Sequence, residues 1–450
     1  MTDVITEILS SIPDYKNFST LEELEETTNR LAEEFPNLVR VRVIGKSREG
    51  RTIRALEIGE REQVAFWFGC PHPNEPIGTL TLDYLSWKLA ESEELRQLLG
   101  FKWVVVKVAD PDGLKLNEGW LKGPFNLLHY ALNYYRPAGN KQVEWSFPIE
   151  YKRLKFDSPI PETQALMEVI SSENPVFIYS LHNAGFGGVY YYISEEAPLL
   201  YPVYWYFPRA EGIPLSLGEP EVPWAKLLAR AVYYMVSTPE YYNFIEEYTD
   251  MDPLEVIKTG TDSYDFARRF NPRVFELVTE VPYFYDSRIE DINPSGENRR
   301  NVILESIEYG MEVLEYVSRI YDRVKGRLKG SGRLRESVEY VLETMPKTLE
   351  AEKSWALKSK EVDREATIAE VFDSRYVSRF YRLLMLGMLY RLLREEGLEE
   401  AEEVRNRMEE LASQLERELR YRVIPIKKLV KIQLAAGLYT ALYVRCTRKG

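Results

Sequence analysis

The chain has 450 residues, of which 45% are hydrophobic and 29% are charged, so a large folded core is expected and a disordered chain is excluded. Acidic residues outnumber basic ones by 71 to 58, and the resulting net charge of −13 argues against nucleic acid as a partner. Two cysteines cannot form a disulfide framework, and with three histidines a histidine-based metal site would have to use most of them.

Neither end of the chain carries a segment typical of export or of a membrane span. The first residues show no basic segment followed by an apolar one, and the apolar stretch at 432–444 is too short to cross a bilayer. Together with the few cysteines, this predicts a cytoplasmic, reduced protein.

The first two-thirds of the chain alternate between strand and helix patterns. Alternating apolar and charged residues at 38–59 predict a β-hairpin after a helix that begins near Thr20. The predicted buried strands are 64–69, 103–110, 175–181 and 274–281, and the predicted helices are 76–95, 161–172 and 301–324. This alternation predicts an α/β fold with a mixed, mostly parallel sheet flanked by helices.

A change of composition at 325–335, where glycines and basic residues gather, suggests a domain boundary. Beyond it only helical patterns occur, at 374–397, 399–420 and 426–446. We therefore predict a catalytic domain over 1–325, including the N-terminal helix and hairpin, and an all-α domain over 335–450. The apolar side of the C-terminal helices is explained equally well by a homo-oligomer contact and by burial against the first domain.

His72 and Glu75 lie in a loop directly after the predicted strand 64–69. Ligands bind at the carboxyl ends of strands in open α/β sheets, and three prolines stiffen this loop. Taken alone, a loop histidine and a solvated acid explain this pair better than a metal does.

His182 strengthens the metal interpretation because it also follows a buried strand, at 175–181. If the two strands are neighbours, His72, Glu75 and His182 converge. Two histidines and one glutamate leave a fourth position open, as in catalytic zinc sites. The sequence therefore predicts one Zn²⁺.

These motifs resemble the zinc carboxypeptidase family typified by carboxypeptidase A, whose metal motif is His-x-x-Glu followed by a distant histidine. Asp110-Pro111-Asp112-Gly113 is similar to the family's Asn-Pro-Asp-Gly turn, and the stretch 260–266 resembles its glycine-led segment ending in Asp-Trp. The resemblance covers roughly residues 20–325 and leaves out the helical tail.

The resemblance implies hydrolysis of a peptide or amide bond by a zinc-bound water and a glutamate general base. The family's base lies on a late strand, where this chain has Glu276 and Glu280, four residues apart and so on one face. Glu280 is favoured, because it follows Thr279 and its spacing from Asp265 is nearer the family's; Glu276 is the alternative. The implied activity is that of a metallocarboxypeptidase acting on a peptide.

The chain departs from the family where a substrate carboxylate would bind. No arginine aligns with the family's Asn-Arg pair, and the tyrosine that closes over the substrate is absent; Arg136 and Arg153 are the candidate substitutes. Two alternatives therefore stay open. One is a zinc amidase or deacylase acting on a modified amino acid, and the other is a zinc-binding scaffold without catalysis.

Three further features have plainer explanations. His129 lies among apolar residues and is expected to be structural, and Cys70 is expected to be a small buried residue. The aromatic run at 190–207 predicts either a pocket lining or packing under a loop.

Overall fold

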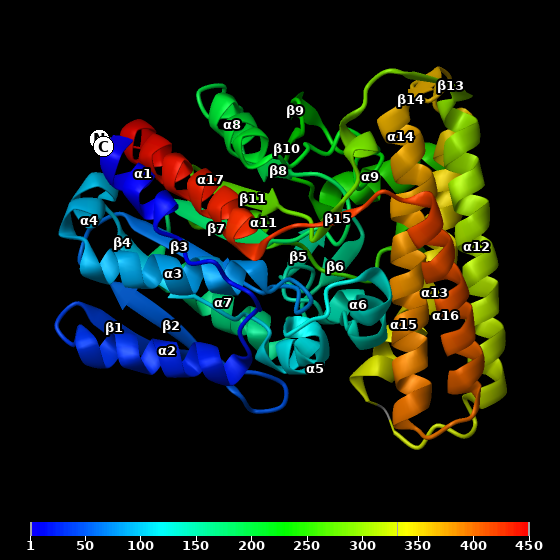
Figure 1. The fold of residues 1–450 in the computed structure, drawn as a ribbon, viewed down its shortest axis with the longest axis horizontal. Coiled ribbons are helices and arrows are strands. Elements are labelled where there is room, and N and C mark those ends of the chain that lie inside the picture. Colours follow the sequence, from blue (N-terminus) through cyan, green and yellow to red (C-terminus); the bar gives the residue numbers. More distant parts are fainter. Residues whose placement is uncertain (1, 331, 449–450) are drawn as a thin grey trace.

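The computed structural model describes residues 2–330 and 332–448 (Figure 1). Within these ranges nine strands form one sheet, in the order β1-β2-β4-β3-β7-β11-β8-β10-β9. The strands are β1 (Val39–Lys46), β2 (Thr52–Ile58), β3 (Val64–Gly69), β4 (Lys102–Val106), β7 (Phe177–His182), β8 (Tyr190–Ile193), β9 (Leu227–Ala229), β10 (Val232–Tyr234) and β11 (Phe275–Glu280). Short two-stranded pairs are formed by β5 (Ile149–Tyr151) with β6 (Leu154–Phe156), β12 (Phe284–Tyr285) with β15 (Arg422–Val423), and β13 (Pro294–Asn298) with β14 (Glu365–Thr367).

The four central strands β4, β3, β7 and β11 run parallel, and the hairpin β1–β2 joins them antiparallel at one edge. Every residue of β3, β7 and β11 is buried, as expected for strands covered on both faces. The predicted mixed, mostly parallel sheet flanked by helices is confirmed.

Helices cover both faces of the sheet. Helices α2 (Leu21–Glu34), α3 (Ile77–Glu91), α8 (Tyr201–Glu211) and α17 (Ile426–Thr447) pack on one side, and α7 (Pro161–Glu173) and α11 (Ser263–Ala267) on the other. The remaining short helices are α1 (Thr2–Ser10), α4 (Glu93–Leu99), α5 (Pro111–Leu121), α6 (Leu127–Asn133), α9 (Thr238–Tyr248) and α10 (Pro253–Val256).

Local sequence signals account for where two helices begin and end. Thr20 and Glu23 form a capping box at the start of α2. The helix predicted over 76–95 is instead split: it stops at Glu91, and the Ser92 hydroxyl accepts a hydrogen bond from the backbone of Leu95 to start α4.

A helical bundle stands beside the sheet, at the right of Figure 1. It contains α12 (Arg299–Val324), α13 (Arg333–Lys358), α14 (Ile368–Phe372), a π-helical turn (Asp373–Val377), α15 (Ser378–Glu395) and α16 (Glu400–Glu418). The division into domains 1–325 and 335–450 stays a prediction. In packing terms, α12 lies with the bundle, whereas α17 lies on the sheet against β7 and β11.

Helix α17 reaches the sheet because Gly437 has no side chain. A Cβ built there would lie 2.4 Å from the Trp67 ring on β3 and 2.6 Å from the Tyr179 ring on β7. Among the described helices, none is long and apolar enough to cross a membrane. Self-association through the C-terminal helices stays a prediction.

Candidate metal centre and active site

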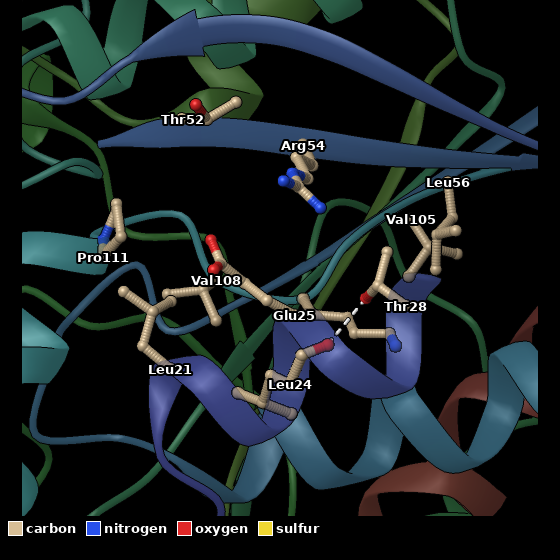
Figure 2. A pocket seen from close by; sticks show the side chains of 11 residues that line it. Leu21, Leu24, Glu25, Thr28, Thr52, Arg54, Leu56, Val105, Val108 and Pro111 are labelled. Carbon is tan, nitrogen blue, oxygen red and sulfur yellow. Dashed lines mark hydrogen bonds between the residues drawn. The ribbon is translucent and has the colours of Figure 1, made fainter. Parts of the chain in front are cut away.

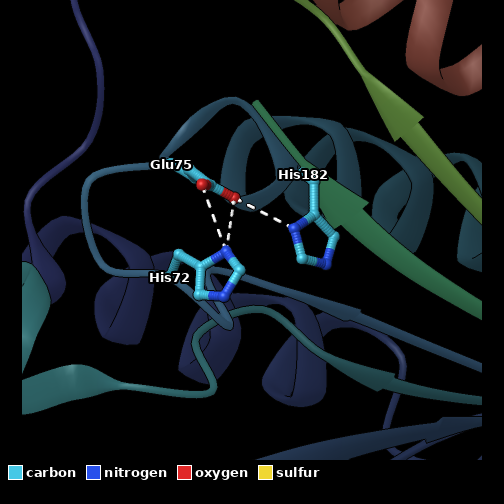
Figure 3. Close-up of side chains that lie close together, drawn as sticks. All are labelled: His72, Glu75 and His182. Atoms are coloured by element: carbon cyan, nitrogen blue, oxygen red, sulfur yellow. Dashed lines mark hydrogen bonds and ion pairs between the residues drawn. The ribbon is translucent and has the colours of Figure 1, made fainter. Parts of the chain in front are cut away.

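The three predicted metal ligands lie at the carboxyl ends of β3 and β7. These strands are parallel neighbours with Gly69 opposite Leu181, so the loop after β3 and the end of β7 reach the same edge of the sheet. Ligand atoms of His72, Glu75 and His182 all lie within 4.8 Å of one another. Figure 3 shows both imidazole rings turned toward the Glu75 carboxylate.

The loop that carries His72 turns sharply away from β3 at Cys70. This buried residue has a φ of 56°, in the left-handed region that a non-glycine residue rarely adopts. The Cys70 carbonyl accepts a hydrogen bond from the Asp110 backbone, and the backbone N–H of Glu75 donates to the carbonyl of His72. These bonds hold the turn and place the His72 and Glu75 side chains on one side of it.

The donor atoms fit a zinc ion. Both Glu75 oxygens lie 3.2 Å from Nδ1 of His72, and one lies 3.2 Å from Nδ1 of His182. Two ligand atoms at zinc-bond distances of 2.0–2.2 Å around a tetrahedral ion are about 3.3–3.6 Å apart. The same nitrogen of each ring thus faces the carboxylate, and the three residues leave one tetrahedral position open.

The electrostatic environment leaves His72 and Glu75 in the protonation states that a metal requires. Burial and the neighbouring Arg136 lower the pKa of His72 to about 4, so the imidazole is neutral. Burial alone would raise the pKa of Glu75, but His72, His182 and Arg136 outweigh it and hold the pKa well below its usual range. The centre therefore offers a neutral imidazole beside an anionic carboxylate. For His182, burial alone would lower the pKa, but the hydrogen bonds to Glu144 and Glu75 outweigh it and raise the pKa well above its usual value, so a metal would bind in place of a proton on this ring.

His182 is held from both faces of the sheet. Its Nε2 lies 2.8 Å from the Ser180 hydroxyl, which donates to a carboxylate oxygen of Glu144 at 2.6 Å. Because Ser180 gives its proton to Glu144, it accepts from Nε2–H, which leaves Nδ1 free to bind a metal. On the other face, Gln433 of α17 donates to the His182 carbonyl at 2.7 Å.

The two candidate bases lie on the same face of β11 but in different places. Glu280 is opposite His182, and its carboxylate lies 3.6 Å from His182 Nδ1. Burial, with the charge of Glu75, raises the pKa of Glu280 well above its usual value. Glu276 is opposite Ile178, further down the strand, where it accepts a hydrogen bond from Ser263. Only Glu280 is therefore beside the candidate metal ligands.

The two candidate arginines are also separated. Arg136 lines the cavity at the metal centre, donating to Glu75 at 2.8 Å and to Gln142 at 3.2 Å. Arg153 pairs with Asp252, and its side chain is 65% exposed outside the cavity lining. The structure brings Arg136, but not Arg153, to the predicted site.

The candidate centre opens into a cavity of about 860 Å³, a size typical of sites for small ligands. Its lining includes the metal ligands, Glu280 and Arg136 on the sheet side, and residues of α12, α13 and α15 on the bundle side, among them Tyr340, Thr344 and Tyr381. The helical bundle is therefore one wall of the candidate active site.

A second cavity, between α2 and strands β2 and β4, has a volume of only about 40 Å³ (Figure 2). It is lined mainly by apolar side chains, and the Thr28 hydroxyl donates a hydrogen bond to the Leu24 carbonyl. It is too small for a peptide or amide substrate.

Three supporting residues were not found from the sequence. Ser180 is two residues before His182, and the period-two rule for strands puts both on one face, so it was within reach of sequence reasoning. Glu144 and Gln433 are far from His182 along the chain, and no local signal links them to it.

A sequence model of the zinc carboxypeptidase family matches residues 24–204. This span contains the two histidines and the glutamate of the candidate metal centre. This part of the chain belongs to the zinc carboxypeptidase family. The match ends before Glu280 and before the helical bundle.

The individual relatives that this chain matches are distant. Zinc carboxypeptidase A 1 of Anopheles gambiae is 32% identical over 126 residues, which is 25% of this chain and 29% of that protein. Carboxypeptidase B of Helicoverpa zea is 31% identical over 108 residues, 22% of this chain and 25% of that protein. The chain thus matches less than a third of the length of these relatives. The match to the crystal structure of carboxypeptidase A from Helicoverpa armigera covers 62% of this chain and 70% of the Helicoverpa armigera chain. The sequence identity is 17% and the TM-score is 0.38.

Proposed function

We propose that this chain is a zinc-dependent hydrolase of a peptide or amide bond, with a metallocarboxypeptidase type of mechanism. The observation that carries the proposal is the Glu280 carboxylate, 3.6 Å from Nδ1 of His182 and facing the same cavity as His72 and Glu75. A scaffold without catalysis would have no use for a buried acid at this position.

In this proposal His72, Glu75 and His182 hold one zinc ion. When bound, zinc supplies a Lewis acid that polarises a carbonyl oxygen and lowers the pKa of water to about 7. Glu280 accepts a proton from the attacking water and returns it to the leaving amine. Burial, the first cause, raises the pKa of Glu280, which makes it a stronger proton acceptor than an exposed carboxylate.

Arg136 is the substrate-binding residue at the centre. Its guanidinium donates to Glu75 and lines the cavity, which supports a role for its remaining N–H groups in binding a carbonyl or carboxylate oxygen of the substrate. A planar fork of donors suits such an oxygen better than a lysine does.

The amidase or deacylase alternative is supported by the bundle wall. Residues of α13 and α15 bound the cavity opposite the sheet, so the space is suited to a short peptide or a small amide rather than to a long chain. A panel that pairs short peptides having a free C-terminus with their C-terminal amides and with N-acyl amino acids separates the two activities.

The experiment that tests the proposal combines metal analysis with two matched variants. We expect about one zinc per chain, loss of amide hydrolysis on chelation and recovery on zinc addition. Glu280→Gln should lower kcat by a factor of at least about 100, in the range of lost general acid–base catalysis, and should retain zinc. Glu276→Gln is the matched control on the same strand face. Full activity of Glu280→Gln would refute the assigned base, and bound zinc with no turnover of any amide would favour the scaffold.

A further inference from the structure

The cavity that contains the candidate active site is strongly acidic. Eight carboxylate residues and three basic residues line it within the described part of the chain. The basic groups are engaged: Arg136 pairs with Glu75, Lys258 donates to the Leu254 carbonyl, and Arg382 contacts the Met345 sulfur. The excess of carboxylates favours a cationic occupant.

Three tyrosine rings lie next to Glu280 along the sheet. Tyr190 of β8 is directly opposite Glu280 of β11, and Tyr192 is opposite Val278. Residues two apart on a strand share a face, so Tyr190 and Tyr192 continue the row formed by His182 and Glu280. Tyr233 of β10 is paired with Tyr192 on the next strand.

The three rings form an angled cluster. The ring centroids of Tyr190 and Tyr192 are 5.9 Å apart at 79°, and those of Tyr192 and Tyr233 are 5.7 Å apart at 39°. Tyr190 and Tyr233 are 6.5 Å apart at 86°. The two contacts of Tyr190 are edge-to-face packing, so the rings touch one another, and a cation in the cavity that they line is attracted to their outer faces through the ring quadrupoles.

The carboxylate of Glu221 lies at this cluster and is held by two neutral donors. Its oxygens accept hydrogen bonds from the hydroxyls of Tyr190 at 2.6 Å and Tyr192 at 2.8 Å. Burial raises the pKa of both tyrosines well above the usual value, so they remain protonated donors. Among the described residues, no lysine or arginine pairs with Glu221 in this arrangement. Its orientation is therefore fixed, and although Glu221 is an exposed residue, no described side-chain cation neutralises it.

Two further acids of the same cavity also lack a cation. Asp373, on the π-helical turn of the bundle, has its pKa raised by burial and by the charges of Glu219 and Glu221. Asp262, at the start of α11, is 6% exposed, and its Oδ2 makes no hydrogen bond. A positive group in the cavity would give both of these carboxyl groups a partner.

We propose that the substrate carries a cationic group, an ammonium or a guanidinium, which binds against the ring cluster of Tyr190, Tyr192 and Tyr233 and pairs with the carboxylate of Glu221. The scissile amide then lies beside Glu280, which is directly across from Tyr190. This inference rests on the proposed hydrolase function and names the substrate class of the same cavity.

The test compares isosteric substrates that differ only in charge. Short N-acyl peptides carry arginine or the neutral citrulline at either residue that flanks the scissile bond, and the readout is the ratio of their kcat/KM values. We expect the zinc-loaded wild type to prefer an arginine substrate by at least about 30-fold, the lower limit for a cation–π contact combined with one charged hydrogen bond. Glu221→Gln should remove about tenfold from that ratio. Glu196→Gln, the same substitution at an exposed residue outside the cavity lining, should leave the ratio unchanged.

A wild-type ratio near one, or a ratio that Glu221→Gln does not change, overturns the proposal.

A second readout does not depend on turnover. Calorimetry on the zinc-loaded Glu280→Gln protein should show tighter binding of arginine amide than of citrulline amide, and adding Glu221→Gln should reduce the difference by about tenfold. If no substrate is hydrolysed but this difference is present, the hydrolase function fails and the cation site stands. Equal binding of the two amides rejects the cation site.

Discussion

Asp112 joins three separate parts of the structure, and replacing it with asparagine should destabilise the protein. Its carboxylate accepts from the Ser47 hydroxyl at 2.7 Å, the Glu49 backbone at 2.9 Å and Arg51 at 2.7 Å, all in the β1–β2 hairpin. It also accepts from Arg333 at 2.5 Å, at the start of α13 in the bundle. Asp112 therefore ties the hairpin, α5 and the helical bundle together.

The expected cost follows from burial. The Asp112 side chain is 0% exposed, and those of Arg333 and Arg51 are 12% and 35% exposed. Removing one member of a buried ion pair costs about 3–5 kcal/mol, because the partner charge is left uncompensated. Asparagine keeps one acceptor oxygen and Arg51 is partly solvated, so we expect Asp112→Asn to lower the free energy of unfolding by about 3 kcal/mol.

The effect should depend on pH in a defined direction. Burial alone would raise the pKa of Asp112, but hydrogen bonds from Ser47 and Arg51, the Glu49 backbone bond and the charge of Arg333 outweigh it and lower the pKa from 3.8. A carboxylate whose pKa is lower in the folded state stabilises the fold above its unfolded pKa, and this contribution is lost as the pH falls through the folded pKa. The difference between wild type and Asp112→Asn should thus be complete at pH 7 and shrink only below about pH 4.

Denaturant unfolding and thermal scans at pH 7 and in acid measure this difference. Asp14→Asn is the matched control, because Asp14 pairs with Lys16 on the surface with its side chain 64% exposed, and its Tm should stay at the wild-type value. An Asp112→Asn protein as stable as wild type at pH 7 would refute the reasoning that this buried carboxylate joins the hairpin to the bundle.

Two other predictions follow from the site and its support. Ser180→Ala should weaken zinc binding by about 10–100-fold, because Nε2 of His182 loses its orienting partner. A competition titration against a chelating dye measures the affinity, and Ser171→Ala, at an exposed position of α7, is the control. Gly437→Val should lower Tm by several degrees, since overpacking costs about 1–3 kcal/mol and the new Cβ would meet the buried Trp67 and Tyr179 rings. Gly326→Val, with nothing within 4 Å of its Cβ position, should change Tm far less, and equal effects would contradict the close packing of α17 on the sheet.

Much of the sheet could be predicted because its signals are local. The continuous apolar runs of β3, β7 and β11 reflect burial on both faces, and the capping box of α2 reflects hydrogen bonds among four consecutive residues. The convergence of the candidate metal ligands was predictable for a related reason, since His72 and His182 are each at the end of such a strand or directly after it. Only the parallel pairing of β3 with β7 was needed to bring them together.

What the sequence alone determined is therefore the strand pattern, the candidate ligands His72, Glu75 and His182, and a choice of two bases on one strand face. The tertiary structure decided which of these groups meet. It placed Glu280 rather than Glu276 beside His182, Arg136 rather than Arg153 in the cavity, and α17 on the sheet, where Gln433 holds the His182 carbonyl. The physical reason is range: periodicity and capping are set by neighbours along the chain, whereas these contacts join segments far apart in sequence, and only the packed fold brings them within hydrogen-bond distance.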